Sequence, residues 1–494
     1  MRKQQKRFAR ILALVLAILL VLGTLASVLF SHAHAEAAIA RDTCQLELTF
    51  FEEEQALQVR QRLRYTNRTG GPLDRVVFSA YANMFRRATA LMYETDVWQQ
   101  AFPAGNAPGG IELSRVLVDG EAADWGMQGE EELFLRVACN LADGQTCEFT
   151  FEYTLLLSEN GASLGVGDTD WRLRGFYLQP LKYEYGEFVA PEPLQHANYV
   201  YADRADYTLA VTLPERCLLA GPGEIASSDN GDGTRTWTLT ADNIRELCLS
   251  FGMRWREYSA ETSSGTRLRL LANARGAQKT LDTALNALEA YESWFGPLAW
   301  DVTIAQSDYA LEALSLPGLI WADADALTDA MALRRALAKQ FFGYGAYPMP
   351  TEDAWLSDSV GAYAACLALR EAEGEDAFLA YLNGVILPEA QYTLPGVEVT
   401  SSAAILSAGE YESLVLGRGA LVMHETCTAM GGETFLAALR LFYERGLTMD
   451  VVGEYDLVSA LDDASGGDWE AFLTDWLFNV ADYYMESYTL DSIE

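Results

Sequence analysis

Histidine is scarce in this chain, whose 494 residues contain only His32, His34, His196 and His424. Because His196 and His424 are far apart in sequence, no two histidines beyond the N-terminal segment can lie one turn apart on a helix. This excludes a catalytic zinc site held by a histidine pair on one helical face. The seven cysteines do not replace such a pair, because they contain no C-x-x-C motif.

Basic residues are few as well. The chain has 35 Lys and Arg against 70 Asp and Glu, which gives a formal net charge of −35. Beyond the N-terminal segment the lysines are Lys182, Lys279 and Lys339. Such an acidic surface repels phosphate backbones and anionic lipid headgroups and mainly supports solubility. Nucleic acid is therefore not an expected partner, and the sequence makes no prediction of the oligomeric state.

Acidic residues are absent from residues 1–35. "MRKQQKRFAR" carries five basic residues, and residues 11–30 ("ILALVLAILLVLGTLASVLF") carry no charge. The length of the apolar run favours a retained membrane anchor, whereas the A-x-A pattern ending at Ala35 favours a signal peptide that is cleaved there. In both cases we expect the chain from about residue 36 to lie outside the cytoplasm, with membrane contact only through the N-terminal segment.

Two kinds of hydrophobic pattern follow this segment. Residues 42–262 alternate apolar and polar side chains over short runs such as "CQLELTFF" and "DYTLAVTLP", with turn residues between them. Residues 263–494 show longer helical periods, which predict helices over 277–296 and 327–343 and strands near 301–308 and 318–323. The expected fold class is multidomain α+β, with an N-terminal antiparallel β-sandwich domain before a mostly helical domain.

Two cysteines flank a turn in "RVACNLADGQTCEFTFEY". The strand-like runs on either side of the turn predict a hairpin, across which Cys139 and Cys147 could form a disulfide in an oxidising compartment. Free buried thiols are the alternative. In the helical region, His424 and Cys427 share one helical face and are interpreted as a core or surface pair, because no further ligand stands near them in sequence.

Several strings in the chain resemble the aminopeptidase N family of zinc peptidases, the gluzincins. "GRGALVMHETCTAMGGETFLAALRLFYERG" is similar to the family's K-G-A helix and the helix after it. "HANYVYADRADYTLAVTLPERCLLAGPGE" resembles the last strands of the family's N-terminal β domain. The resemblance covers about residues 45–480, and it implies that the helical domain is a thermolysin-like peptidase domain.

The resemblance also identifies the positions of the family's metal ligands. The family places H-E-x-x-H on one helix and, after eighteen further residues, a glutamate on a second helix. Here "RALAKQFFG" matches the first helix, with Arg335 and Lys339 at the histidine positions and Ala336 at the general base. "WLSDSVGAY" matches the second, with Asp358 at the glutamate, and eighteen residues separate it from Lys339. The spacing is kept, but the ligands are replaced.

Other family positions are replaced too. The glutamate that recognises the free amine of a substrate in G-A-M-E-N corresponds to Ser315, and the transition-state tyrosine corresponds to Leu416. Tyr411 stands where some relatives carry another tyrosine. From the family's cleft, Ser315, Asp358 and Tyr411 are candidate substrate-binding residues. No catalytic residue and no metal are expected, because neither arginine nor a protonated lysine can donate a lone pair to zinc.

These substitutions leave three functional hypotheses. The favoured one is an exported, non-catalytic pseudopeptidase that binds a peptide or protein in the cleft. The alternatives are an active metallo-aminopeptidase that cleaves N-terminal residues from peptides, and a structural or assembly element at the cell surface.

The cations on the first helix permit two interpretations. Arg335 and Lys339 either cover a solvated helix face, or Asp358 pairs with one of them where metal bridges the two helices in the family. Zinc with two neutral histidines and a carboxylate carries a net charge of +1, which is also the sum for Arg335, Lys339 and Asp358. The second hypothesis predicts a carboxylate oxygen of Asp358 close to Arg335 or Lys339.

Overall fold

The structure is a computed structural model that describes residues 41–86, 95–103, 105, 108–129, 131–311, 313–390 and 397–478. The expected leader, including residues 11–30 and the cleavage point at Ala35, lies outside these residues. Among the described residues, no helix has both the length and the apolar character that are needed to cross a bilayer.

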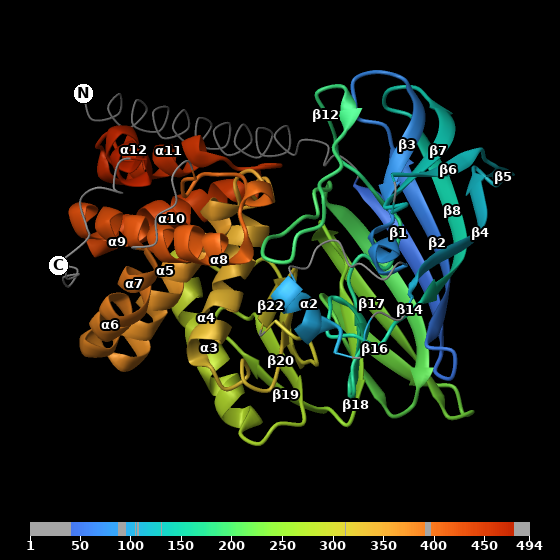
Figure 1. The fold of residues 1–494 in the computed structure, drawn as a ribbon, viewed down its shortest axis with the longest axis horizontal. Coiled ribbons are helices and arrows are strands. Elements are labelled where there is room, and N and C mark those ends of the chain that lie inside the picture. The colour runs from blue at the N-terminus through green and yellow to red at the C-terminus, as the bar shows by residue number, and fades with distance from the viewer. Residues whose placement is uncertain are drawn as a thin grey trace, which may run out of the picture. The chain divides into compact units, whose positions relative to one another are not determined.

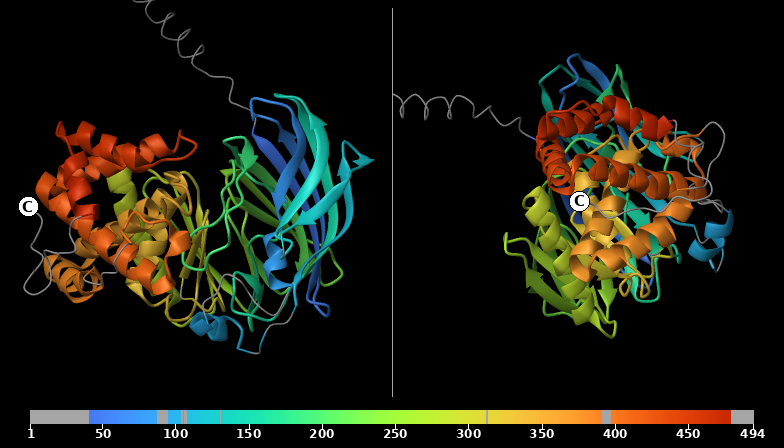
Figure 2. Two further views of the ribbon diagram at one scale, coloured as in Figure 1. Left: turned by 45° about the horizontal axis from the view of Figure 1, so that its top comes forward. Right: turned by 90° about the vertical axis from the view of Figure 1, so that its left-hand side faces the viewer.

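The β-rich part of the chain comprises strands β1 to β18 (Figure 1). Its largest sheet has eight strands within the described residues, with the blue-to-green strands side by side and twisted in Figure 2. In order across the sheet these are β16 (Glu224–Asp229), β17 (Thr234–Ile244), β14 (Ala205–Pro214), β1 (Asp42–Phe51), β2 (Ala56–Thr66), β8 (Thr146–Leu156), β4 (Gly110–Val118) and β5 (Glu121–Ala122).

Smaller sheets pack on one side of this sheet. The first contains β15 (Cys217–Ala220), β18 (Leu249–Met253), β10 (Asp170–Leu173) and β9 (Leu164–Val166). The second contains β11 (Gln179–Pro180), β3 (Leu73–Ser79), β7 (Phe134–Leu141) and β6 (Trp125–Gln128), and a hairpin is formed by β12 (Tyr183–Glu184) and β13 (Glu187–Phe188). Two short helices, η1 (Tyr81–Phe85) and α2 (Thr95–Ala101), complete this part.

Alternation of side chains produces the sandwich. Buried and exposed residues alternate at every position of β1, so one face of the strand enters the core and the other faces solvent. Across the core, Phe78 of β3 contacts Phe149 and Phe151 of β8 edge to face, with ring centroids 5.1 Å apart in each pair. The N-terminal antiparallel β-sandwich expected from the sequence is therefore present.

The predicted hairpin around Cys139 and Cys147 is wrong. The two strands belong to different sheets, since β7 pairs with β3 and β6 whereas β8 pairs with β2 and β4. The turn between them carries the chain from one layer of the sandwich to the other. Both cysteines are free thiols, as are the other five.

The helix-rich part of the chain begins with a five-stranded mixed sheet. In order its strands are β19 (Arg256–Glu261), β20 (Arg267–Ala272), β21 (Val302–Gln306), β23 (Leu319–Ala322) and β22 (Ala313–Leu316). β21 and β23 lie at the predicted strand positions, whereas β22 was not predicted. β19 belongs to this sheet, so the sheet begins before the division between domains that the sequence predicts at residues 262 and 263. That division stays a prediction.

Helices pack against this sheet and against one another. They are α3 (Ala277–Phe295), α4 (Ala330–Lys339), η2 (Gln340–Gly345), α5 (Ala354–Glu373), α6 (Glu375–Tyr381), η3 (Leu382–Ile386), α7 (Leu387–Ala390), η4 (Ala403–Ile405), α8 (Ala408–Tyr411), η5 (Glu412–Arg418), α9 (Gly419–Met430), α10 (Gly432–Gly446), α11 (Glu454–Ser465) and α12 (Glu470–Phe478). α3 confirms the helix predicted over 277–296. A continuous core of buried side chains joins the sheet to these helices.

The helix predicted over 327–343 differs from the prediction at both ends. α4 begins at Ala330, because the Asp329 side chain caps it by accepting hydrogen bonds from the backbone N–H groups of Met331 and Ala332, at 2.8 and 3.2 Å. Gly343 does not end the helix. The chain continues beyond Lys339 as a π-helix through Gly345, a widened turn that often occurs at functional sites.

Asp450, in the loop between α10 and α11, links the helix-rich part to the β-rich part. Its carboxylate accepts hydrogen bonds from Lys182, which follows β11, and from Arg245, which follows β17. The side chains of Lys182 and Arg245 are only 5% and 4% exposed, whereas that of Asp450 is 58% exposed. The guanidinium of Arg245 also stacks on the ring of Tyr347. Lys182 also pairs with Asp203 at 2.7 Å, so Asp450 shares the compensation of Lys182 and is the described carboxylate that pairs with Arg245.

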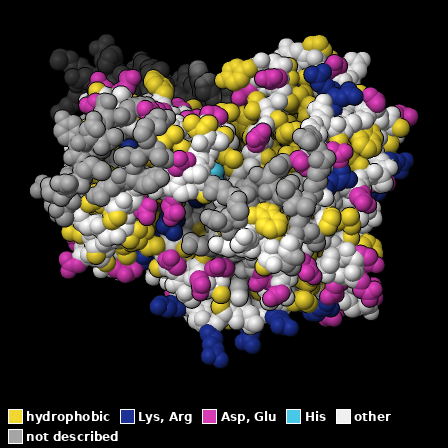
Figure 3. Space-filling view, viewed as in Figure 1, with side chains coloured by type: hydrophobic (Ala, Val, Ile, Leu, Met, Phe, Trp, Pro, Cys, Tyr) yellow, Lys and Arg dark blue, Asp and Glu magenta, His cyan; other side chains and the backbone are white. Residues whose placement is uncertain are grey.

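Surface carboxylates in general do not form a link of this kind. Asp and Glu side chains are scattered over the face shown in Figure 3 rather than gathered at one place. Exposed ion pairs such as Arg445 with Asp463 contribute about 0–1 kcal/mol.

We predict that Asp450→Ala lowers the free energy of unfolding by about 1–3 kcal/mol, because it removes a charged acceptor from two buried cations. Among the described hydrogen bonds to other residues, Lys182 then keeps the one to Asp203 and Arg245 keeps the one to the backbone oxygen of Ala202. Asp463→Ala, which removes an exposed carboxylate, is the control and should change it by less than about 1 kcal/mol. Urea unfolding monitored by circular dichroism measures both variants. An Asp450→Ala variant as stable as the control would contradict the role of this carboxylate.

The same link predicts a pH dependence. Burial acts to raise the pKa of Asp450, but hydrogen bonds and charge from Lys182 and Arg245 outweigh it and lower that pKa below its ordinary value. A carboxyl whose pKa is depressed in the folded state stabilises the fold above its ordinary pKa and loses this contribution as the pH falls. The stability difference between the wild type and Asp450→Ala should therefore shrink below about pH 4.

Candidate functional site

One face of α4 lines a cavity of about 370 Å³. Ala332, Arg335, Ala336 and Lys339 recur at the three- and four-residue spacing of one helical face, and all four line the cavity. The opposite face of α4 enters the core with Leu333 and Leu337, which are fully buried. The pattern of small and basic residues on one side and leucines on the other thus fixes which residues face the cavity.

Lys339 and Asp358 join α4 to α5. The ammonium nitrogen of Lys339 lies 2.7 Å from Oδ1 and 2.9 Å from Oδ2 of Asp358. The side chain of Asp358 is 9% exposed and that of Lys339 is 22% exposed, so the pair is largely removed from water. The predicted contact between Asp358 and a cation of the first helix is confirmed, with Lys339 as the partner.

Two hydroxyl groups complete the surroundings of the carboxylate. Tyr411 donates a hydrogen bond to Oδ2 of Asp358 at 2.6 Å, and Ser357 donates one to Oδ1 at 2.8 Å. Burial, and then the negative charge of Asp358, raise the pKa of the Tyr411 hydroxyl well above its ordinary value, so it remains a donor. Tyr411 lines the cavity as expected from the family's cleft, but its hydroxyl is engaged with Asp358.

Gly343 allows Lys339 to reach Asp358. A Cβ atom at this position would lie 2.7 Å from Cγ of Lys339 and 2.8 Å from the Ser357 hydroxyl oxygen. Both distances are far below van der Waals contact, so any side chain here would displace the lysine or the serine. The glycine of "QFFG" therefore serves close packing in the π-helix.

Ser315, the candidate for amine recognition, is buried and fully engaged. Its hydroxyl donates to the backbone oxygen of Ala336 at 2.8 Å and accepts from Gln340 at 2.8 Å. The side-chain oxygen of Gln340 in turn accepts hydrogen bonds from the Trp300 indole and the Gly318 backbone, each at 3.0 Å. This network ties β22 to the start of the π-helix, so Ser315 has a structural role here.

Arg335 extends beside the cavity on the same helix. It contacts Tyr381 of α6, where burial raises the pKa of the phenol and the hydrogen bond and charge from Arg335 oppose this. No ion pair joins Arg335 to a carboxylate among the described residues. Asp358 thus pairs with Lys339 and not with Arg335, the other partner that the sequence allowed.

The rest of the cavity wall comes from distant parts of the sequence. Leu416 and Glu412 belong to η5, which is another π-helix. His196 comes from the β-rich part, and its Nε2 lies 3.0 Å from the backbone oxygen of Ala403 while its ring lies 5.0 Å from that of Tyr411. The sequence named Leu416 and Tyr411 through the family resemblance but gave no signal for His196.

The residues at the family's metal positions do not fit zinc. Arg335 and Lys339 present N–H donors where lone pairs are required, and Ala336 has no functional group. Both oxygens of Asp358 are already bound to Lys339, Tyr411 or Ser357. Across the described part of the chain, no group of three or more His, Cys, Asp or Glu side chains is arranged to hold a metal ion.

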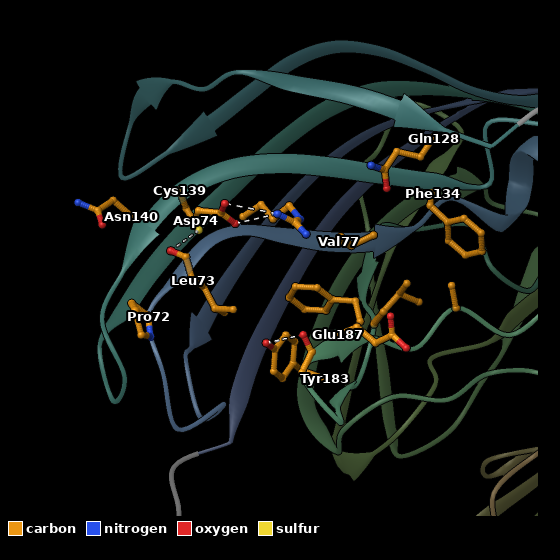
Figure 4. A pocket seen from close by; sticks show the side chains of 15 residues that line it. Pro72, Leu73, Asp74, Val77, Gln128, Phe134, Cys139, Asn140, Tyr183 and Glu187 are labelled. Atoms are coloured by element: carbon orange, nitrogen blue, oxygen red, sulfur yellow. Dashed lines mark hydrogen bonds and ion pairs between the residues drawn. The ribbon is translucent and has the colours of Figure 1, made fainter.

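A larger cavity of about 820 Å³ lies in the β-rich part (Figure 4). It lies between β3 and β7 on one side and the β12–β13 hairpin on the other, where Tyr183 and Phe188 meet edge to face. Asp74 on its wall pairs with its neighbour Arg75, at 3.0 Å. None of the positions singled out by the family resemblance lines it, whereas Ser315, Lys339 and Asp358 line the 370 Å³ cavity, which is therefore the candidate functional site.

No protein-family model matches the chain. Over 405 residues the chain is 26% identical to aminopeptidase N of Lactococcus lactis subsp. lactis, a match that covers 74% of this chain and 46% of that protein. The chain therefore spans about half the length of the curated relative that it matches.

Solved structures share the fold. The M1 zinc metallopeptidase from Deinococcus radiodurans superposes with a TM-score of 0.65 at 18% identity, over 92% of this chain and 96% of that chain. A mutant of an M1 zinc metallopeptidase from the same organism, bound to a Tyr-Ser-Ala substrate, gives a TM-score of 0.63 at 20% identity, over 89% and 94%. The chain is thus similar in sequence to aminopeptidase N and has the two-domain fold of the M1 zinc metallopeptidases.

Proposed function

We propose that the chain is a non-catalytic relative of the zinc aminopeptidases that binds a peptide or protein ligand in the 370 Å³ cavity. One observation carries the proposal: the Lys339 ammonium is paired with Asp358 at the position where the family's metal and its carboxylate ligand meet. An ammonium at this point satisfies the carboxylate and keeps α4 bound to α5 without an ion.

Loss of hydrolysis follows from the same residues. Peptide hydrolysis by this class needs a metal-activated water and a base to accept its proton. Ala336 stands at the position of the base and Leu416 at that of the transition-state tyrosine, and neither side chain can move a proton. The cavity thus has the residues that would surround a ligand but lacks the groups that would catalyse hydrolysis.

Peptide binding is supported by the size and lining of the cavity. Its volume lies within the range of about 300–1,000 Å³ that is typical of ligand sites. Its walls contain both apolar or aromatic and polar side chains, among them Tyr309, Leu311, Leu314 and Gln195. One solved relative with this fold is bound to a tripeptide substrate. We also propose that the protein acts outside the cytoplasm, on the basis of residues 1–35.

Zinc content and turnover test the proposal. We expect purified protein to contain far less than one zinc per chain and to show no chelator-sensitive hydrolysis of a panel of amino-acid amides. The physical reason is the lack of lone-pair donors at residues 335 and 339. Stoichiometric zinc together with turnover that a chelator abolishes would establish the alternative, an active metallo-aminopeptidase. Lactococcal aminopeptidase N, assayed in parallel, serves as the positive control.

A double-mutant cycle measures the pair that replaces the metal. We predict that Lys339→Met and Asp358→Asn are coupled by about 1–3 kcal/mol in the free energy of unfolding, because the pair is a charged hydrogen bond that is largely shielded from water. The exposed pair Arg440 and Glu444, treated in the same way with Met and Gln, should show about 0.3–0.5 kcal/mol. Equal coupling energies for the two cycles would remove the special role of Lys339.

Restoring the ligands tests whether the positions still converge. We predict that the triple variant Arg335→His, Lys339→His, Asp358→Glu binds about one zinc per chain and is stabilised by zinc, because two imidazoles then face a carboxylate across α4 and α5. Arg335→His alone, which keeps Lys339, is the control and should bind no stoichiometric zinc. Elemental analysis and thermal unfolding with and without zinc measure both. A folded triple variant without zinc would show that the residues are misassigned.

A further inference from the structure

Among the described residues, Arg335 is the cation of the cavity lining that pairs with no carboxylate. Within the described part of the chain, the charged lining of the cavity consists of Arg335, Lys339, Asp358 and Glu412. Lys339 and Asp358 neutralise each other, and Glu412 is exposed to solvent. Arg335 is partly buried, and its hydrogen-bond partner Tyr381 is a neutral phenol. The formal charges of this described lining sum to zero, and Arg335 is the partly buried charge that belongs to no ion pair among the described residues.

The neighbours of Arg335 leave its guanidinium accessible from the cavity. Ala332 lies three residues before it and Ala336 directly after it, and both line the cavity with a single methyl group. A larger side chain at either position would cover the arginine. The planar guanidinium presents paired N–H donors whose spacing matches the two oxygens of a carboxylate.

The acceptors at the amine-recognition and metal positions are engaged, and the remaining carboxylate of the described lining, Glu412, is exposed to solvent. Ser315 at the amine-recognition position uses its hydroxyl for Ala336 and Gln340, and Asp358 is bound by Lys339 and Tyr411. An ammonium group entering the cavity would therefore meet the like charge of Arg335, which disfavours it.

We propose that Arg335 binds a carboxylate of the peptide ligand, so that the cavity selects an acidic group where the family selects an amine. The proposal rests on the proposed function of the cavity as a peptide site. The carboxylate comes either from a peptide C-terminus or from an Asp or Glu side chain, since both offer the same pair of oxygens. Leu311, Leu314 and Leu416 provide the apolar wall for the adjoining side chain.

Calorimetric titration of the full chain with four dipeptide probes tests the proposal. The probes are N-acetyl-Ala-Leu with a free carboxylate, its amide, Ala-Leu amide with a free amine, and N-acetyl-Glu-Leu amide with a side-chain carboxylate. We expect at least one of the two carboxylate probes to bind about 10- to 100-fold more tightly than N-acetyl-Ala-Leu amide. The tighter of the two identifies the source of the carboxylate.

Variants then locate the effect. Arg335→Met should abolish the difference between acid and amide, and Arg335→Lys, which keeps the charge but not the paired donors, should keep part of it. Arg440→Met removes an exposed arginine of α10 and should leave the difference unchanged. Thermal unfolding establishes that each variant is folded, and the comparison of probes on the wild type stands without them.

The possible results separate this proposal from the proposed function. Equal binding of acid and amide would overturn the carboxylate preference and leave peptide binding intact. Tighter binding of the free-amine probe would overturn it and indicate the family's ordinary polarity. A difference that persists in Arg335→Met would place the carboxylate elsewhere and overturn the role of Arg335. Failure of all four probes to bind would overturn the proposed function along with it.

Discussion

The contact between the Lys339 ammonium and the Asp358 carboxylate is the interaction on which the rest of the site depends. It occupies the junction of α4 and α5, and it is largely shielded from water. A buried carboxylate without a partner costs several kcal/mol, so Asp358 requires compensation. A lysine one helical turn beyond Arg335 provides this compensation with a single side chain.

The neighbouring structure accommodates this contact from several directions. Gly343 leaves the space for the lysine stem, and Tyr411 and Ser357 satisfy the remaining positions of the carboxylate. The π-helix after Lys339 turns Gln340 toward Ser315, which ties the edge of the five-stranded sheet to the same region. The cavity is consequently bounded by elements whose polar groups are already bonded to one another. Arg335 differs from Lys339 in that its described partner is the phenol of Tyr381 and not a carboxylate.

Regular elements were predictable because local patterns determine them. The alternation in β1 and the helical period of α3 both reflect one buried face, which the sequence states directly. The π-helix through Gly345 was not predictable, since it depends on hydrogen bonds between Gln340 and a strand distant in sequence. The failed hairpin has a similar cause. A polar turn between two strands looks the same whether the chain returns to its sheet or crosses to the next.

The candidate site, too, could be predicted from the sequence only in part. Spacing and family resemblance together placed Lys339 and Asp358 opposite each other, and the structure brings them into contact. The structural role of Ser315 could not be predicted, because a short stretch of sequence does not reveal that a hydroxyl is hydrogen-bonded within the protein. His196 reaches the cavity from the β-rich part, and only the packing of the whole chain could reveal this.

The enclosure of Asp358 has an evolutionary consequence. Exchanging Lys339 for histidine by itself removes the cation while Arg335 still blocks metal coordination, so the intermediate has a poorly compensated carboxylate and no ion. Exchanging Arg335 first gains no ligand pair. Two substitutions are therefore needed before a histidine pair faces Asp358, and a first one at Lys339 leaves that carboxylate without its cation.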